Sequence, residues 1–431
     1  ITDMDGVLRG KYVNSEKLKK AIEDGFGFCN VVFGWDIKDV CYENTKVSGW
    51  HTGYPDAIAK VDLKTNRKIP WDHDTPFFLA DFSEAPDEIQ QVCPRTLLKK
   101  IRQQCMDLGY QAFFSNEYEW FNFKETPQSL KDKNYINPQP ITPDMFGYSL
   151  LRLSLNQNYV NDLFEQLTQF NIPLEGLHTE TGDGVYEAAI VYADILEAAD
   201  RAILFKTSVK EIAYRHQIMA SFMAKWNTEL PGCSGHIHQS LWDVEKKKNL
   251  FYDANQDHSI SSLMQHYIAG QLHCLPHILP MFAPTVNSYK RLVTGSWASV
   301  SASWGIENRT TALRVIPHHE SSMRLETRVP GADANPYLAM AASLASGLYG
   351  IRHQLPLAVE LTKGNEYDNP KNQRLPKNLW DATQSMKNSS IANELFGTAF
   401  TDHFIRTREW EWQQYEQQVS DWELRRYFEL V

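Results

Sequence analysis

Residues 299–338 read SVSASWGIENRTTALRVIPHHESSMRLETRVPGADANPYL, and this stretch is the key to the rest of the chain. Its alternating apolar residues and turn formers predict short strands. These strands carry four arginines: Arg309, Arg314, Arg324 and Arg328. The planar guanidinium fork suits bidentate binding of phosphate or carboxylate, so we predict an anion site. The alternative is a solvated strand edge whose charges face water.

An acid lies among these cations. Because side chains alternate along a strand, Arg324, Glu326 and Arg328 are expected on one face. A metal ion that joins Glu326 to a phosphate would explain why an acid interrupts a cationic row. The stretch therefore predicts a site for an anion together with a metal.

Composition limits the class of protein. The chain has 431 residues and a formal net charge of −10, with 42% hydrophobic residues. This balance is typical of a globular protein of two domains and argues against nucleic acid as the main partner. No apolar run reaches the length of a membrane span. Six cysteines without metal-ligand spacing predict free thiols in a reducing cytoplasm. The sequence starts abruptly in a strand-like segment, so we expect residues upstream of it.

Hydrophobic periodicity divides the chain near residue 92. The first part mixes short strand-like pieces with turns, whereas amphipathic helices are frequent after Pro94. We predict one domain over residues 1–92 and a larger one over residues 93–431. The expected helices include 15–24, a helix opened by Pro94, 159–170, 191–224 and 261–279, and the expected strands include 111–123 and 236–242.

Three segments gather metal-ligating side chains. They place Glu117 near Glu119, Glu180 near Glu187 across a tight loop, and His236 near His238. Like charges on one strand face repel unless a cation lies between them. Mostly oxygen ligands indicate Mg²⁺ or Mn²⁺, and such ions beside arginines are typical of phosphoryl transfer. The alternative for each pair is a solvent-facing acid or a structural histidine.

These motifs together resemble the glutamine synthetase family over nearly the whole chain. They occur in order as Glu117-x-Glu119, His178-x-Glu180 with Glu187, Gly235-His236-x-His238-Gln239-Ser240, Asn287 to Arg291, Asn308-Arg309 and Arg324-x-Glu326-x-Arg328. The resemblance implies an α+β protein with an amino-terminal β-grasp domain and a large catalytic α/β barrel domain. It also implies a homo-oligomer of stacked rings, a dodecamer, with sites between subunits and no nucleic acid or membrane as partner.

The resemblance further implies a reaction and roles for single residues. ATP phosphorylates the γ-carboxylate of glutamate, and an amine attacks the acyl phosphate. One Mg²⁺ or Mn²⁺ ion is expected at Glu119, Glu180 and Glu187, and the other at Glu117, His236 and Glu326. The substrate site is expected to include Glu119, Gly232, Arg291, Trp297 and Arg328. ATP is expected at His238, Ser240, Arg309, Arg314 and Arg324, with Arg309 steadying the transferred phosphoryl group.

Departures from the family pattern concern the nucleophile. Ammonia-using members carry a flap glutamate in a PGYEAP-like stretch, whereas residues 295–299 read GSWAS, with Trp297 at the glutamate position. Tryptophan lines an apolar pocket or stacks on a cation but cannot balance an ammonium charge as a carboxylate does. The ammonia-binding aspartate is expected to survive as Asp56, contributed across the subunit boundary. Pro231 replaces an asparagine that contacts glutamate.

These departures resemble the γ-glutamylpolyamine and γ-glutamylamide synthetase branch. We therefore expect an ATP-dependent ligase that joins glutamate to an organic amine. One alternative is an ammonia-using glutamine synthetase whose flap has drifted. Another is a catalytically silent structural relative, which would have no physical reason to hold like charges together.

Overall fold

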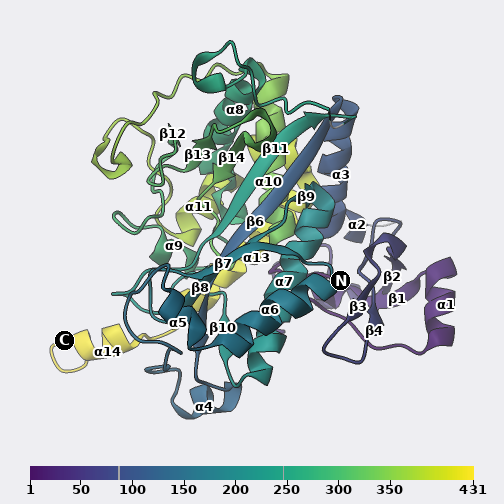
Figure 1. Cartoon of the computed structure of the whole chain (residues 1–431). Coiled ribbons are helices and arrows are strands. Elements are labelled where there is room, and N and C mark those ends of the chain that lie inside the picture. Colours follow the sequence, from purple (N-terminus) through teal and green to yellow (C-terminus); the bar gives the residue numbers. More distant parts are fainter. Residues whose placement is uncertain (86–87, 246) are drawn as a thin grey trace.

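The computed structural model describes residues 1–85, 88–245 and 247–431. Its main sheet has nine strands, in the order β12-β13-β14-β11-β6-β8-β7, with β9 and β10 also paired to β6. Figure 1 shows the long strands β6 and β11 side by side at its centre. The bounds are β6 Tyr110–Phe123, β7 Leu174–Thr179, β8 Val185–Ile190, β9 Ala193–Asp194, β10 Met219–Ser221, β11 Gly235–Asp243, β12 Trp304–Ile306, β13 Leu313–Ile316 and β14 Arg324–Thr327.

Strand β6 separates the site from the core. Tyr118 and Trp120 are buried on one face, where Tyr118 stacks on Phe205 with ring centroids 5.7 Å apart. Because side chains alternate, Glu117 and Glu119 point to the other face. The aromatic residues thus fix the side of the sheet on which the acids lie.

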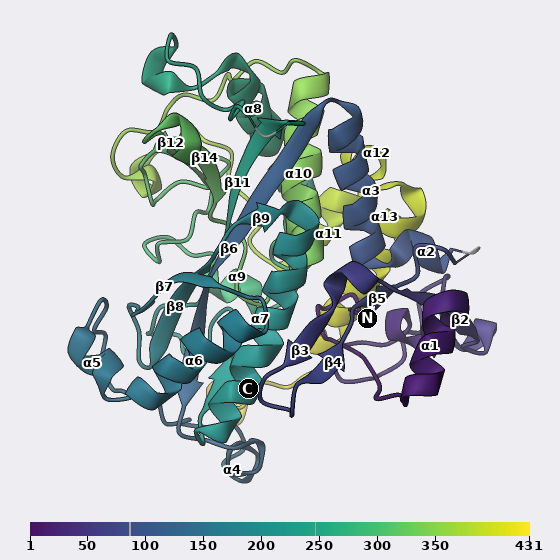
Figure 2. The ribbon, with the colours of Figure 1, turned by 45° about the vertical axis from the view of Figure 1, so that its right-hand side comes forward.

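Helices cover the apolar face of the sheet. These are α3 (Pro94–Asp107), α7 (Ile195–Arg215), α8 (Ser262–Ile278) and the almost fully buried α10 (Pro336–Arg352). Helix α10 packs against α3, α7 and α8, and Figure 2 shows it beside α3. Helix α8 approaches α10 so closely that a Cβ on Gly350 would lie 2.0 Å from the carbonyl oxygen of His266. A glycine at this position therefore permits the close contact.

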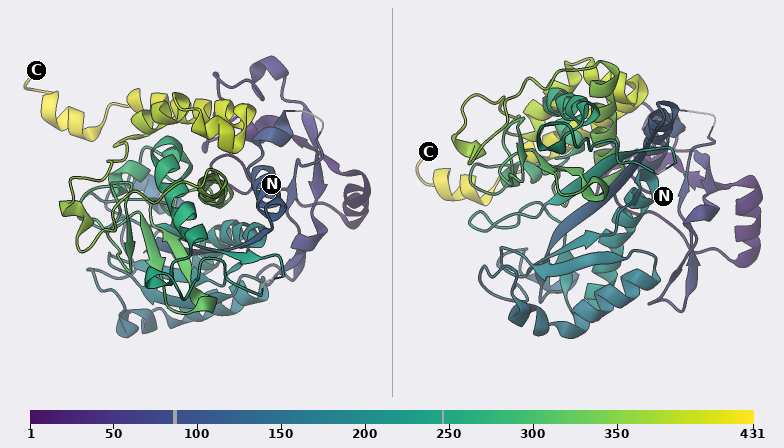
Figure 3. Two further views of the ribbon diagram at one scale, coloured as in Figure 1. Left: turned by 90° about the horizontal axis from the view of Figure 1, so that it is seen from above. Right: turned by 45° about the horizontal axis from the view of Figure 1, so that its top comes forward.

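The amino-terminal part forms smaller sheets beside this body, as Figure 3 shows. Its elements are α1 (Ser15–Asp24), β1 (Phe26–Cys29), β2 (Asp56–Val61), β3 (Arg67–Ile69), β4 (Thr75–Phe77) and β5 (Ala80–Asp81), with β1-β2-β5 in one sheet and β3-β4 in another. Buried Arg95 joins the two parts, because it pairs with Asp81 at 2.6 Å and with Asp200 at 2.8 Å. Both the β-grasp fold and the boundary at residue 92 stay predictions.

The remaining helices lie around this frame. They are α2 (Ile89–Val92), α4 (Pro127–Asp132), α5 (Leu150–Ser154), α6 (Gln157–Gln169), α9 (Ser288–Arg291), α11 (Leu379–Lys387), α12 (Ile391–Phe396), α13 (Thr398–Glu416) and α14 (Asp421–Tyr427). Helix α14 projects from the body near the carboxyl terminus (Figure 1). No helix among the described residues is long and apolar enough to cross a membrane.

Most sequence-predicted elements are confirmed, with two corrections. The helix predicted over 191–224 is shorter, because α7 ends at Arg215 and Gln217 takes a left-handed φ of 57° before β10. The predicted barrel is not found as a closed ring within the described residues, where β12 and β7 are the unpaired ends of the sheet. The coarser expectation of a mixed fold with a large sheet and covering helices is confirmed.

Candidate active site

Strand register brings the predicted acids and histidines together. It opposes Glu117 with His236, Glu119 with Glu187, and Glu326 with His238. Directly opposed residues of antiparallel strands put their side chains on the same face. Segments more than 200 residues apart in sequence, from Glu117 to Glu326, therefore build one polar face.

The first part of this face centres on His236. Its Nδ1 is buried without a hydrogen bond of good geometry, although Glu326 Oε1 lies 3.3 Å away and Glu117 Oε2 3.7 Å away. Burial and the positive charge of Arg328 lower the pKa of His236 to about 4, so its imidazole is neutral. Burial alone would raise the pKa of Glu117, but the nearby imidazoles of His236 and His238 outweigh it and lower that pKa.

The second part crowds three acids, Glu119, Glu180 and Glu187, around His178. Glu187 Oε2 lies 3.3 Å from His178 Nε2, and Glu180 Oε2 lies 3.7 Å from His178 Nδ1. Burial and the nearby charges of Glu119 and Glu117 raise the pKa of Glu187 well above its ordinary value. Glu119 accepts a hydrogen bond from the Ser234 backbone N–H at 2.6 Å, and burial raises its pKa too.

These residues fit a hard divalent cation. Three groups offer ligand atoms that lie within 4.8 Å of one another: Glu117 with His238 and Glu326, Glu117 with Glu187 and His236, and His178 with Glu180 and Glu187. The set is mostly carboxylate oxygen, as Mg²⁺ and Mn²⁺ prefer, and neutral His236 offers a buried nitrogen without a partner. Glu119 belongs to none of these groups among the described residues, and its Oε2 accepts from Ser234.

Arginines border the acids on β13 and β14. Arg314 and Arg328 both donate to Glu326, Arg314 at 3.0 Å. Arg324 Nε donates to His238 Nδ1 at 3.2 Å. The predicted common face of Arg324, Glu326 and Arg328 is thereby confirmed. Arg314 also pairs with Glu307, so in this structure its guanidinium is held by two acids.

Arg291 and Gly232 lie next to this row. The Arg291 guanidinium is buried and donates to the carbonyl oxygens of Val329 at 3.0 Å and Arg328 at 3.1 Å. Burial lowers its pKa. A Cβ on Gly232 would lie 2.3 Å from the carbonyl oxygen of Ala224 and 3.0 Å from Arg291 Cγ, so a larger residue would clash with the backbone as well as crowd this arginine. Close packing explains why a glycine is needed here.

The other predicted residues are more exposed or more distant. Arg309 is exposed, and its carbonyl oxygen accepts from Arg328 Nε at 3.1 Å. Ser240 Oγ accepts from Trp242 Nε1 at 2.9 Å. Trp297 is 62% exposed with a left-handed φ of 58°. Asp56 opens β2 in the amino-terminal sheet, and within the described part of this chain no hydrogen bond or ion pair links it to the acids.

The sequence left two site residues without a role. His178 belongs to the motif His178-x-Glu180, and its period-2 spacing to Glu180 predicts that the two side chains share a strand face. Tyr148 had no local signal, yet its ring stacks on His178 with centroids 4.4 Å apart. Burial and the charges of Glu180 and Glu187 raise the pKa of Tyr148, which places its hydroxyl near the acids.

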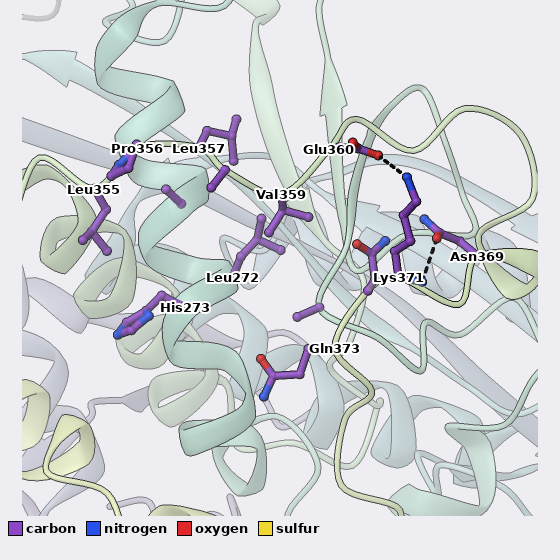
Figure 4. Close-up of a pocket in the computed structure, with 14 residues that line it drawn as sticks. Leu272, His273, Leu355, Pro356, Leu357, Val359, Glu360, Asn369, Lys371 and Gln373 are labelled. Carbon is purple, nitrogen blue, oxygen red and sulfur yellow. Dashed lines mark hydrogen bonds and ion pairs between the residues drawn. The ribbon is translucent and has the colours of Figure 1, made fainter.

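A cavity of about 520 Å³ lies elsewhere. Helix α8 and residues 355–373 form most of its wall, as Figure 4 shows. None of the predicted site residues lines it. Within the described residues, the charged face gathers possible metal ligands beside arginines and this cavity does not, so the charged face is the candidate active site.

An open sheet that combines such a metal set with arginines defines an enzyme that acts on phosphates with a divalent ion. Residues 91–427 match the family described as glutamine synthetase, catalytic domain. The chain belongs to the glutamine synthetase family, whose enzymes are ATP-dependent ligases that use divalent metal ions.

Three similar proteins give the family context. A type-1 glutamine synthetase 2 from Dictyostelium discoideum is 49% identical over 433 residues, covering 100% of this chain and 83% of that one. A glutamate–isopropylamine ligase from a Pseudomonas species is 36% identical, covering 100% of this chain and 94% of that one. A solved GmaS/ADP complex is 26% identical with a TM-score of 0.85, covering 99% of this chain and 95% of that one.

Proposed function

We propose that this enzyme joins the γ-carboxylate of glutamate to an organic amine through a γ-glutamyl phosphate. The observation that carries the proposal is Trp297, which occupies the position of the flap glutamate in ammonia-using members of the family. No residue from 295 to 299 carries a carboxylate. The similarity to a glutamate–isopropylamine ligase over the whole chain supports the same conclusion.

The first half-reaction transfers a phosphoryl group. An oxygen of the glutamate γ-carboxylate attacks the γ-phosphorus of ATP, and ADP leaves. Divalent ions, when bound, neutralise phosphate charge. Their proposed ligands are Glu119, Glu180 and Glu187 for one ion and Glu117, His236 and Glu326 for the other. In this proposal Arg291 and Arg328 hold glutamate, and exposed Arg309 contacts the transferred group. His238, Ser240, Arg314 and Arg324 contact ATP.

The second half-reaction needs a neutral amine. An ammonium ion must lose a proton before its nitrogen can attack the acyl carbon and release phosphate. We propose that Asp56 of a neighbouring copy accepts that proton, which requires the predicted ring assembly with sites shared between subunits. Trp297 would then cover the carbon substituents of the amine and exclude water from the acyl phosphate.

A panel of amines tests this function. Wild-type enzyme would be given glutamate, ATP and Mg²⁺ with ammonium, small alkylamines, ethanolamine or polyamines, and the amide product measured by mass spectrometry. We expect an organic amine to give a higher kcat/KM than ammonium. Trp297→Glu should shift this ratio towards ammonium, and Trp297→Phe serves as the matched aromatic control. Ammonium as the best substrate by kcat/KM would contradict the proposal.

A glutamine synthetase is the second candidate, because the Dictyostelium relative with that name is 49% identical. The same panel separates the two functions by the preferred nucleophile. A silent structural relative would release no ADP with any amine. The raised pKa of Glu187 argues against a catalytically silent protein. Acids crowded together destabilise the folded state when they are ionised, unless a cation is bound between them.

A further inference from the structure

Residues 362–375 form a segment that we call the strap, which runs beside the flap (residues 295–301). The strap bonds the base of the flap through its backbone, because Ala302 N donates to Gln373 O at 2.8 Å and Leu375 N donates to Val300 O at 3.0 Å. Tyr367 Oη also donates to the carbonyl oxygen of Ala298 at 3.1 Å, one residue from Trp297. Movement of the strap would therefore move the flap.

The strap also holds the segment that carries Arg309. Asn308 Nδ2 donates to the carbonyl oxygen of Gly364 at 2.8 Å. The backbone N–H of Glu366 donates to Thr310 Oγ1 at 3.0 Å. The residues on both sides of Arg309 are thus fixed to the strap, although the Arg309 side chain itself is exposed. One segment sets the position of two parts of the proposed site.

Glu366 is what anchors the strap. From residue 363 to residue 374, all of them described, it is the only buried side chain, with 0% exposure. Its Oε1 accepts from Ser301 Oγ at 2.6 Å, its Oε2 accepts from Thr362 Oγ1 at 2.8 Å, and both accept from Asn372 Nδ2. Apolar packing holds the end of the strap, where Leu375 is buried in the core, whereas Asn372 and neighbouring strap residues border the cavity of Figure 4.

A buried carboxylate is costly unless its oxygens are hydrogen-bonded, and an apolar side chain could fill the same space without that cost. In the described part of the chain, no ion pair to a lysine or arginine neutralises Glu366, so neutral donors alone satisfy it. Such a fully bonded group imposes one geometry on its partners. Ser301, at the end of the flap, is one of those partners.

We propose that Glu366 is a positioning residue, which sets the flap with Trp297 and the segment with Arg309 through the strap. This inference rests on the proposed function for the roles of those two residues. Glu366 touches neither substrate nor reacting atoms. Its effect would be to keep water away from the γ-glutamyl phosphate until the amine attacks. Loosening the strap should therefore divert the acyl phosphate to hydrolysis, which regenerates glutamate and releases phosphate.

The test compares amide product with ADP in full-length enzyme. Glu366→Gln keeps the size and one carbonyl oxygen, Ser301→Ala removes only the bond to the flap, and Glu360→Gln is the control. Glu360 lies just before the strap with its side chain 78% exposed, paired with Lys371. We expect the first two variants to lose about ten- to a hundredfold in kcat/KM for amide, as misplacement by about 1 Å can cause. In Ser301→Ala, which loosens the flap, glutamate-dependent ADP release should persist, so the amide formed per ADP falls. Glu366→Gln also loosens the segment with Arg309, so it should lose part of its ADP release and still form less amide per ADP.

The outcomes separate this inference from the proposed function. The positioning role would be overturned if Glu366→Gln and Ser301→Ala both formed as much amide per ADP as wild type, whatever their melting temperatures. Equal loss of amide and ADP in Ser301→Ala, which loosens the flap and leaves the bonds to the Arg309 segment in place, would overturn it as well. If ammonium is the preferred nucleophile, the proposed amine specificity fails, but the same ratio measured with ammonium still decides the role of Glu366. A wild-type enzyme without ADP release would overturn both.

Discussion

Glu326 is the buried acid on which the arginine face depends. Its side chain is 0% exposed, and it bonds both Arg314 and Arg328. Burial alone would raise its pKa, but the charge of Arg328 first, and then the neighbouring histidines and Arg314, lower that pKa from 4.5 to about 2. Glu326→Gln keeps the shape, removes the charge and leaves two guanidiniums without their shared carboxylate.

The expected loss follows from these values. A pKa lowered from 4.5 to about 2 corresponds to roughly 3 kcal/mol in favour of the charged folded form. Breaking a buried ion pair by removing one partner costs about 3–5 kcal/mol. We therefore expect the free energy of unfolding of metal-free protein to fall by about 3 kcal/mol at neutral pH. Because the folded pKa is the lower one, this contribution is present above pH 4.5 and is lost as the pH falls towards 2.

Urea unfolding followed by tryptophan fluorescence measures this loss. The protein concentration is kept constant, because assembly makes apparent stability depend on it. Glu307→Gln is the matched control, since Glu307 pairs with the same Arg314 but its side chain is 37% exposed. That variant should lose less than about 1 kcal/mol. Two results would refute the buried-charge reasoning. One is an equal loss of unfolding free energy in the two variants. The other is a difference in unfolding free energy between wild type and Glu326→Gln that stays the same as the pH falls.

Three further outcomes are expected. Arg309→Ala should slow glutamate-dependent ADP release by about 10³-fold or more while sedimentation shows unchanged assembly, and near-normal release would mean that the site is misplaced. Asp56→Ala should spare ADP release but reduce amide formation, measured in the same reaction, and equal loss of both would argue against proton acceptance by Asp56. The pKa of Glu187 is raised by burial and by Glu119, so its contribution to the stability of metal-free protein is lost as the pH rises through the folded value. The increase in melting temperature on adding Mg²⁺ should therefore grow as the pH rises above 4.5, the ordinary pKa of a glutamate. An increase that does not depend on pH would contradict the link between Mg²⁺ binding and the ionisation of Glu187.

The sequence by itself determined the local features of the site. Period-2 spacing predicted that Glu117 and Glu119 share a face, and the structure confirms it through the buried aromatic residues between and beside them. The limits of α1 were predicted to the residue, because helical periodicity and capping are properties of neighbouring residues. The motif order also sufficed to place the chain in its family, which the match over residues 91–427 confirms.

Only the tertiary structure decided which of these faces meet. Period-2 spacing fixes the side of a strand on which a residue lies, but the pairing of β6 with β11 and β8 depends on contacts between segments far apart in sequence. The pairing of β7 with β8 brings His178 to Glu187, and the pairing of β6 with β11 brings Glu119 near Ser234. Likewise, the residues next to Glu366 in sequence do not predict that it is buried. Its carboxylate accepts a hydrogen bond from Ser301, which is 65 residues away in sequence.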